Sequence, residues 1–297
     1  MKILELSGIE KSYGRIKALN GVSFDVPEGS VFGVLGPNGS GKTTLLSIIL
    51  DVLSADKGNF QWFGKPGSPE TRKNIGSLLE TPNFYHYLSA VNNLKVTQSI
   101  SERGDRTAIN DVLKKVSLFE RRNSRFSTYS LGMKQRLAIA SALLGNPRVM
   151  VLDEPTNGLD PVGIVEIRQL IQQLRSEGFT IIIASHLLDE VEKICTHVAI
   201  LKKGEVVASG AVDDVLTDED VIEISAPDQA KLRELATLVP GITQWKEDGK
   251  FLHLHFIKGE ADPLKINQFY FDNGVVLQHL NIRKKRLEAK FFELTGN

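Results

Sequence analysis

The chain has 297 residues, which is enough for one large domain or two smaller ones with a substantial buried core. Its 41% apolar and 24% charged residues are typical of a globular protein. Basic and acidic residues number 36 each, which argues against a nucleic-acid binder that relies on a basic surface. The one cysteine, Cys195, excludes an internal disulfide and fits a reducing compartment. The sequence has no apolar run long enough to span a membrane and no signal-peptide pattern, so we expect a cytoplasmic protein.

The most informative segment is a glycine-rich loop between an expected strand and an expected helix. Residues 3–35 alternate short apolar runs with turns and predict strands, the last of them over 31–35. The loop reads Gly36-Pro37-Asn38-Gly39-Ser40-Gly41-Lys42-Thr43, and a helix-forming stretch starts at Thr44. In this context the glycines let backbone N–H groups face an anion, Lys42 can reach the β- and γ-phosphates of a nucleotide, and the Thr43 hydroxyl can ligate Mg²⁺. We therefore predict that residues 36–44 bind ATP, because an ordinary glycine-rich turn does not explain the flanking elements.

The next segments alternate strands and helices. Residues 54–64 predict a hairpin, and 85–146 a mainly helical segment that ends at Gly145-Asn146-Pro147. Apolar strands at 149–152 and 180–184 flank a helix that begins at Asp160-Pro161, with Asp160 as its N-cap. A short helix at 187–194 and a hairpin over 197–209 follow. Such alternation predicts an α/β fold with a mostly parallel sheet core.

A second, smaller domain is predicted beyond a boundary near Asp218-Glu219-Asp220. Over residues 221–283 the order is strand, helix, strand, strand, helix and strand, with Asp248-Gly249 as the turn of the central hairpin. This order is that of a ferredoxin-like α+β domain. We thus expect a nucleotide-binding domain over 1–218, with a helical subdomain at about 85–146, and an accessory domain over 219–297 that ends in a helix at 287–294.

An acidic pair ends the strand at 149–152. Because parallel strands end at one edge of a sheet, Asp153 should lie near the phosphate loop, where such an aspartate holds Mg²⁺ in phosphate-loop ATPases. Glu154 follows and is placed to orient and deprotonate an attacking water. With Lys42 present, the pair indicates ATP hydrolysis rather than a solvated helix cap. His253 and His255 also share a strand face, but we expect a structural role for them because no cysteine or carboxylate cluster accompanies them.

Six elements, in their order along residues 1 to about 215, resemble those of ATP-binding-cassette (ABC) ATPases. The first three are Tyr13, which looks like the aromatic residue that stacks on adenine, the phosphate loop, and Glu80 at the Q-loop position. The fourth is Tyr129-Ser130-Leu131-Gly132-Met133-Lys134-Gln135-Arg136, which resembles the signature motif. The last two are Asp153 and Glu154 of the Walker B strand, followed by Gly158-Leu159-Asp160 as the D-loop, and His186 as the switch histidine. The signature discriminates this family from other phosphate-loop ATPases.

The resemblance implies a homodimer that buries two ATP molecules and Mg²⁺ between subunits arranged head to tail. In this arrangement Glu154 and His186 are catalytic, and Ser130, Gly132 and Asp160 act in trans on the ATP of the other subunit. The metal ligands implied are Thr43, Glu80 and Asp153. The expected partner is a separate membrane permease, whose cytoplasmic helix docks beside Glu80 and the segment from Tyr85, and this places the protein at the inner face of the membrane. No nucleic acid is expected.

Three departures from the family pattern indicate a subgroup. Leu131 and Met133 replace a glycine and the glutamine of the usual signature, Glu80 replaces the Q-loop glutamine, and residues 219–297 extend the minimal cassette. Together they resemble the ATPases of bacitracin-resistance and lantibiotic-immunity exporters, so we expect export. Two alternatives stay open. One is a soluble ABC ATPase of ribosomes or DNA, although the second cassette, coiled-coil insertions and zinc sites of such proteins are missing. The other is an ATP-gated clamp with little hydrolysis, which the three replaced residues favour.

Overall fold

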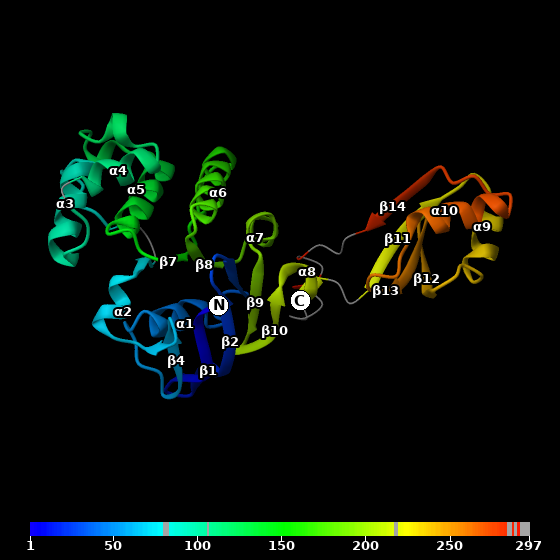
Figure 1. Ribbon diagram of the computed structural model, residues 1–297, viewed down its shortest axis with the longest axis horizontal. Helices are drawn as coiled ribbons and strands as arrows, with labels where there is room; N and C mark the ends of the chain where they lie inside the picture. The colour runs from blue at the N-terminus through cyan, green and yellow to red at the C-terminus, as the bar shows by residue number, and fades with distance from the viewer. Residues whose placement is uncertain (80–82, 106, 217–218, 284–286, 288–289, 292–297) are drawn as a thin grey trace. The chain divides into compact units, whose positions relative to one another are not determined.

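The computed structural model describes residues 1–79, 83–105, 107–216, 219–283, 287 and 290–291. It divides into two compact units, Met1–Ala211 and Val212–Asn297, which are described separately below (Figure 1). Glu80, Asp218 and most of the predicted helix over 287–294 lie outside the described residues. None of the helices in the described ranges has both the length and the apolar composition of a membrane span.

The first unit begins with an antiparallel sheet in the order β2–β1–β4–β5. Its strands are β1 (Lys2–Tyr13), β2 (Ile16–Pro27), β4 (Lys57–Trp62) and β5 (Lys65–Pro66). β1 and β2 form a long hairpin that turns at Gly14, whose φ of 59° suits a glycine. The inward-facing residues of β1 and β2 pack with those of α1 (Lys42–Ile49) in one apolar core.

A six-stranded sheet in the order β10–β9–β3–β8–β7–β6 forms the centre of the first unit. Its strands are β3 (Val31–Leu35), β6 (Ile75–Leu78), β7 (Val149–Asp153), β8 (Thr180–Ser185), β9 (His197–Lys202) and β10 (Glu205–Ala211). β6, β7, β8, β3 and β9 pair in parallel, and β10 pairs antiparallel with β9. β3, β7 and β8 are buried along their whole length, which explains their continuous apolar sequences. The predicted parallel core is confirmed.

In the described residues of the first unit, seven α-helices connect its strands. They are α1, α2 (Pro69–Lys73), α3 (Ala90–Ser101), α4 (Ala108–Lys115), α5 (Leu131–Leu143), α6 (Pro161–Ser176) and α7 (Leu188–Ile194). Figure 1 shows α3, α4 and α5 gathered together, and we refer to residues 90–143 as the helical segment. α6 begins as predicted, since the Asp160 carboxylate accepts a hydrogen bond from the Gly163 amide and Pro161 is the first helical residue.

The strand register fixes where the functional loops lie. Leu35 of β3 pairs with Ser185 of β8, and Ala184 of β8 pairs with Asp153 of β7. Three neighbouring parallel strands therefore end at one level. The loops that follow them, which begin at Gly36, Glu154 and His186, leave the sheet side by side at its carboxyl edge, where open α/β sheets bind their ligands.

The second unit contains a four-stranded antiparallel sheet in the order β12–β13–β11–β14. Its elements are α8 (Val212–Leu216), β11 (Glu219–Ser225), α9 (Gln229–Ala236), β12 (Ile242–Asp248), β13 (Phe251–Ile257), α10 (Pro263–Asp272) and β14 (His279–Arg283). Apolar residues of α9 and α10, among them Leu232, Ile266 and Tyr270, pack with Ile222 and Leu254 of the sheet. Because β13 lies between β12 and β11, this is the split β-α-β arrangement of the ferredoxin-like fold that the sequence predicts.

Candidate nucleotide site

The phosphate loop curls tightly between β3 and α1. Gly39 and Gly41 have φ angles of 78° and 106°, and Gly41 is the N-cap of α1. A Cβ atom at Gly36 would lie 2.3 Å from Ser40 Oγ, and one at Gly41 would lie 2.5 Å from the carbonyl oxygen of Ala18. Glycine is therefore required both for the backbone conformation and for the space. The loop leads directly into the N-terminus of α1, whose amide groups and dipole favour an anion.

Lys42, the first residue of α1, is buried inside this loop, with 7% of its surface exposed. Its Nζ donates hydrogen bonds to the carbonyl oxygens of Gly36 at 2.8 Å and Pro37 at 3.3 Å. Burial lowers the pKa of Lys42, while the negative charges of Glu154 and Asp153 act in the opposite direction. The ammonium group is thus held in the loop by two carbonyl groups that a phosphate oxygen can replace.

Thr43 and Asp153 bring two oxygen ligands together. Thr43 Oγ1 donates a hydrogen bond to Asp153 Oδ2 at 2.9 Å, and Asp153 is 4% exposed at the end of β7. A hydroxyl and a carboxylate are hard oxygen donors, which is the ligand chemistry that Mg²⁺ prefers. Mg²⁺ therefore fits this pair of residues.

Glu154 and His186 form a second pair at the same edge of the sheet. His186 Nδ1 lies 2.9 Å from Glu154 Oε2, at hydrogen-bond distance. The Glu154 amide donates a hydrogen bond to the carbonyl oxygen of Ala184. The φ of Glu154 is 47°, a left-handed value that is unusual for a residue with a side chain. The fold therefore holds this carboxylate in a strained conformation next to an imidazole, beside Asp153.

Sequence reasoning did not identify Ser185, which shapes the turn that presents His186. Ser185 is 3% exposed, and its Oγ accepts a hydrogen bond from the Leu187 amide at 3.0 Å. A serine at the end of a buried strand, directly before a histidine, is the signal that could have indicated this turn.

The signature residues lie at the start of α5. Ser130 is its N-cap and accepts a hydrogen bond from the Met133 amide at 3.3 Å. Apart from its chain neighbours and the backbone of its own helix, no atom of the described residues lies within 4 Å of the position of a Cβ at Gly132, so this part of the helix start is open. Leu131 is 47% exposed, and its Cδ2 would lie 3.3 Å from a Cβ at Gly158. The start of α5 thus contacts the loop that continues to Asp160, the N-cap of α6.

Tyr13 lies apart from these pairs, at the end of β1. It is 51% exposed, so its ring is available for stacking. The structure does not describe Glu80, the predicted Q-loop residue, and therefore gives no position for it relative to Thr43 and Asp153.

In the second unit, His253 and His255 belong to a polar network on β13. Glu223 of β11 lies at hydrogen-bond distance, 3.0 Å, from both His253 Nε2 and His279 Nε2, and it forms an ion pair with Arg283 Nε at 3.0 Å. Burial acts to raise the pKa of Glu223, but the hydrogen bonds from the two histidines and the charge of Arg283 outweigh it and lower the pKa below its ordinary value. His255 Nδ1 lies 3.0 Å from Glu219 Oε1.

Comparisons with known proteins agree with this site. Residues 19–157 match the family described as ABC transporter. The bacitracin transport ATP-binding protein BcrA of Bacillus licheniformis is 34% identical over 99% of this chain and 97% of its own length. The lantibiotic transport ATP-binding protein SrtF of Streptococcus pyogenes is 38% identical over 71% of this chain and 92% of its own.

A solved structure of a dimeric ATP-binding cassette, in a post-hydrolysis state with ADP and Pi, superposes with a TM-score of 0.63. It is 28% identical to this chain and covers 70% of it and 98% of the solved chain. The predicted family, the phosphate-loop ATPase fold and the predicted ATPase activity are thereby confirmed. The chain belongs to the ABC transporter family and is an ATP-binding subunit that hydrolyses ATP.

Proposed function

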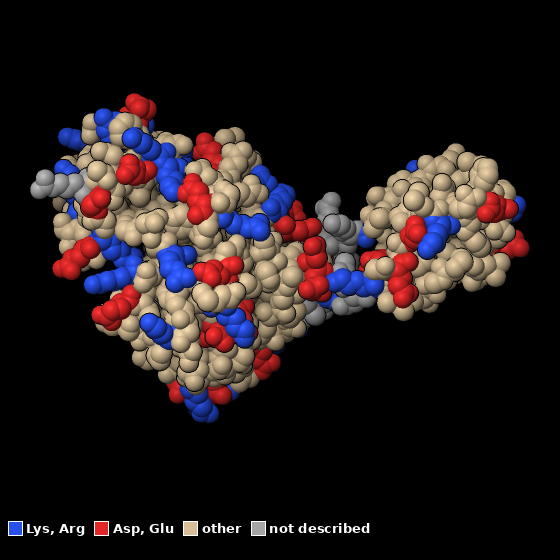
Figure 2. Space-filling model, in the orientation of Figure 1, with Lys and Arg blue, Asp and Glu red and all other residues tan. Residues whose placement is uncertain are grey.

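We propose that this chain powers an exporter, as a homodimer that drives a separate membrane permease from the inner face of the membrane. The observation that carries the proposal is the convergence of Lys42, Asp153, Glu154 and His186 at one edge of the sheet. The relationship to the bacitracin transport protein extends over 99% of the chain and so includes the second unit, which supports export. Figure 2 shows acidic and basic side chains interspersed on the visible face of the first unit, which does not favour nucleic acid as a partner.

In the proposed nucleotide site, residues 36–44 bind the phosphates and the Tyr13 ring stacks on adenine. Lys42 exchanges the carbonyl oxygens of Gly36 and Pro37 for oxygens of the β- and γ-phosphates. Thr43 and Asp153 hold Mg²⁺, with Glu80 as a further ligand from the sequence pattern. When bound, Mg²⁺ neutralises negative charge on the phosphates.

Hydrolysis then depends on Glu154 and His186. Glu154 accepts a proton from the water that attacks the γ-phosphorus, while the bond to the bridging oxygen of ADP breaks and inorganic phosphate leaves. We propose that His186 orients this carboxylate and donates a hydrogen bond to the γ-phosphate, and its 2.9 Å contact to Glu154 supports the first of these roles.

In this proposal the second copy of the chain completes the ATP-binding site of the first copy. In our proposal Ser130, Gly132 and Asp160 of the second copy face the γ-phosphate, and the N-terminus of α5 adds its positive dipole. Ser130 Oγ accepts from the Met133 amide, which leaves its own hydrogen free to donate to a phosphate oxygen. We further propose that residues 1–218 form the nucleotide-binding domain and that residues 219–297 support the dimer.

Co-purification tests the proposal. The chain is co-expressed with a candidate permease, a polytopic membrane protein sought among the products of neighbouring genes, and the complex is isolated in detergent through a tag on the membrane protein. We expect this chain in the complex at two copies, and ATP hydrolysis that increases when the complex is reconstituted in vesicles. Failure to co-purify, together with co-sedimentation with ribosomes or binding to DNA, would refute the transport assignment in favour of the soluble ATPase class.

A further inference from the structure

The helical segment joins the core of the first unit where α5 ends. At Gly76 of β6, a Cβ would lie 2.0 Å from the carbonyl oxygen of Ala142 in α5. At Gly145, directly after α5, a Cβ would lie 2.8 Å from Arg103 Cβ. The connection between α3 and α4, which contains Arg103, therefore meets the end of α5 and the start of β6 at one place, which we call the joint.

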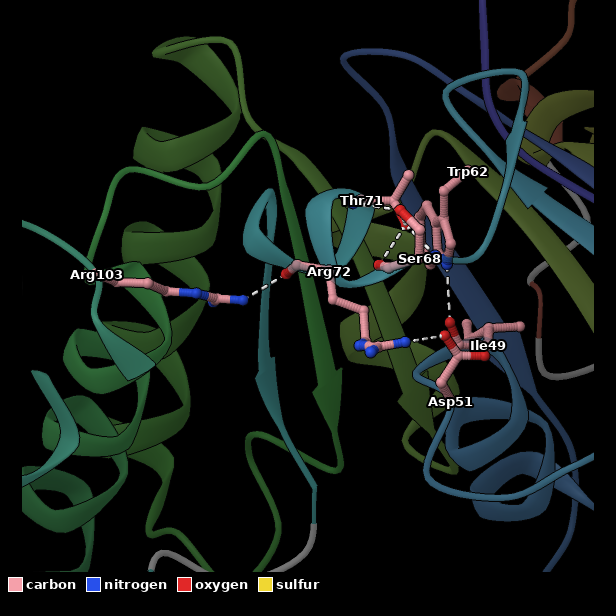
Figure 3. Close-up of polar contacts among 7 residues, drawn as sticks. All are labelled: Ile49, Asp51, Trp62, Ser68, Thr71, Arg72 and Arg103. Carbon is pink, nitrogen blue, oxygen red and sulfur yellow. Dashed lines mark hydrogen bonds and ion pairs between the residues drawn. The ribbon is translucent and has the colours of Figure 1, made fainter. Parts of the chain in front are cut away.

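Arg103 spans this joint with its guanidinium group. Its Nη1 donates to the carbonyl oxygen of Ile75 at 2.7 Å. Its Nη2 donates to the carbonyl oxygen of Arg72, the bond that Figure 3 shows. A planar guanidinium presents both donors in a fixed geometry, and bonds from a charged donor are stronger than neutral ones. Because both acceptors are backbone atoms, Arg103 holds the end of α2 and the start of β6 themselves.

α2 in turn holds the end of α1, the helix that begins with Lys42. Arg72 Nη1 pairs with Asp51 Oδ2 at 2.6 Å, two residues beyond the end of α1 (Figure 3). Asp51 has a left-handed φ of 57°, and Trp62 Nε1 donates to the carbonyl oxygen of Ile49 at 2.8 Å. Polar contacts thus run without a break from the helical segment to the phosphate-binding helix.

A pocket of about 440 Å³ opens to solvent next to the joint. Residues of α4, α5 and the loops around them line it, including Asp105, Val112, Lys115, Leu143 and Phe179. On the other side α5 packs closely on β6, as the short distance between Gly76 and Ala142 shows. The hydrogen bonds from Arg103 therefore add a directional polar link to this packing.

We propose that Arg103 is a positioning residue for ATP hydrolysis, because it holds α5 at the angle to the core at which Ser130 reaches the ATP of a second copy. The inference rests on the proposed function, in which Ser130 acts in trans. The two hydrogen bonds of the Arg103 guanidinium group go to Ile75 and Arg72, which belong neither to the phosphate loop nor to the signature. The loss of Arg103 therefore loosens the dimer site and leaves the nucleotide contacts within one copy intact.

Arg103→Ala and Arg103→Lys in the full chain test this proposal. We would measure the Kd of a fluorescent ATP analogue at protein concentrations that keep the chain monomeric, the kcat and KM for ATP, and ATP-dependent dimerisation in a Glu154→Gln background. We expect Arg103→Ala to keep the monomer Kd and to lose roughly tenfold or more in kcat, as a small misplacement of a reacting geometry does. Dimerisation should require more ATP. The kcat of Arg103→Lys and its ATP requirement for dimerisation should lie between those of the wild-type chain and Arg103→Ala, because an ammonium group keeps the charge but lacks the two parallel donors of the planar guanidinium group.

Two further variants complete the design. Lys95→Ala removes an exposed cation from α3 of the same segment and should leave all values unchanged. Asp51→Asn places an asparagine at position 51, which adopts the left-handed conformation readily but pairs more weakly with Arg72. This variant should therefore lower kcat, but by a smaller factor than Arg103→Ala does.

The outcomes separate this inference from the proposed function. If Glu154→Gln alone, with Arg103 intact, forms no ATP-dependent dimer, the proposed function is refuted before any Arg103 variant is compared. A folded Arg103→Ala chain with wild-type kcat and dimerisation overturns the inference alone. Equal losses in monomer Kd and kcat also overturn it, because they indicate a general defect of the fold. If Arg103→Ala does not fold, the Lys variant decides, and wild-type kcat in that variant overturns the inference.

Discussion

Thr43 Oγ1 donates a hydrogen bond to Asp153 Oδ2 at 2.9 Å, although the two residues are 110 positions apart in the sequence. The contact links the first turn of α1 to the end of β7. In the sheet, β8 lies between β7 and β3, the strand that leads into the phosphate loop. Phosphate binding and the carboxylate pair Asp153 and Glu154 are therefore assembled in one small region, and predictions about each can be tested separately.

Replacement of Lys42 by alanine should weaken nucleotide binding strongly. Lys42 is the buried cation of the phosphate loop, so its loss removes the charge that we propose binds the β- and γ-phosphates. We expect the Kd for ATP to rise by roughly a hundredfold or more, the value of a strong charge-assisted contact. A fluorescence titration measures this, with the exposed Lys57→Ala as the control. Unchanged ATP affinity would contradict the assignment of the phosphate loop.

Glu154→Gln should separate binding from hydrolysis. The amide keeps the size of the side chain but cannot accept the proton of the attacking water, so ATP binds and remains uncleaved. We expect the ATPase rate to fall by roughly a hundredfold or more and ATP-dependent dimers to accumulate on a sizing column. A Glu154→Gln chain that hydrolyses ATP at the wild-type rate would remove Glu154 from its proposed role.

Ser130 offers a pair of variants that separate helix capping from phosphate binding. Ser130→Ala removes the N-cap of α5, which costs about 1 kcal/mol of stability. Ser130→Asp keeps a good N-cap but places a negative charge where we propose that the γ-phosphate of the second copy lies. We therefore expect the Asp variant to melt at the wild-type temperature and yet to form no ATP-dependent dimer. Normal dimerisation of this variant would exclude Ser130 from the dimer site.

Acid should destabilise the second unit through Glu223. Its folded-state pKa is lowered from the ordinary value of 4.5, so its contribution to stability is present above that value and is lost as the pH falls through the lowered folded pKa. We expect the hydrogen-exchange protection factors of β11 and β13, which are corrected for the intrinsic exchange rate at each pH, to fall below pH 4.5. Glu223→Gln should reduce this pH dependence, and Glu234→Gln on the exposed side of α9 should not. Identical pH profiles for the wild-type and Glu223→Gln chains would exclude this carboxylate as the cause.

Glu80→Gln should change how ATP hydrolysis couples to the permease. At the Q-loop position that the sequence pattern predicts, glutamate would add a charge beside the phosphates and, when ionised, could not donate a hydrogen bond, whereas glutamine could. We expect the basal ATPase rate of the isolated subunit to change less than the rate of the complex reconstituted in vesicles. An unaltered ratio of the two rates would show that the glutamate is not part of the coupling.

Much of the site could be predicted because its chemistry lies in contiguous motifs at the ends of strands. The phosphate loop follows β3, Asp153 ends β7 and His186 follows β8, so the parallel order alone places them at one edge. The second unit was predictable for a similar reason, since strand and helix order with one hairpin turn defines a ferredoxin-like arrangement.

Contacts between distant segments could not be predicted in this way. Arg103 is one of many basic residues in a charged stretch, and its partners are carbonyl groups, which carry no side-chain signature. The left-handed backbone of Asp51 and Glu154 likewise depends on tertiary contacts, because neither residue type demands it. Three neighbours of Glu223 come from β13 and β14, and their meeting depends on the strand register.

The backbone of Glu154 has a consequence for engineering this protein. At a φ of 47° a glycine has less backbone strain than any residue with a side chain. Glu154→Gly should therefore raise the melting temperature, although it removes the carboxylate that we propose is catalytic. A selection for heat resistance alone would therefore drive this enzyme toward an inert variant. Thermostable forms are better sought by screening for survival and turnover together.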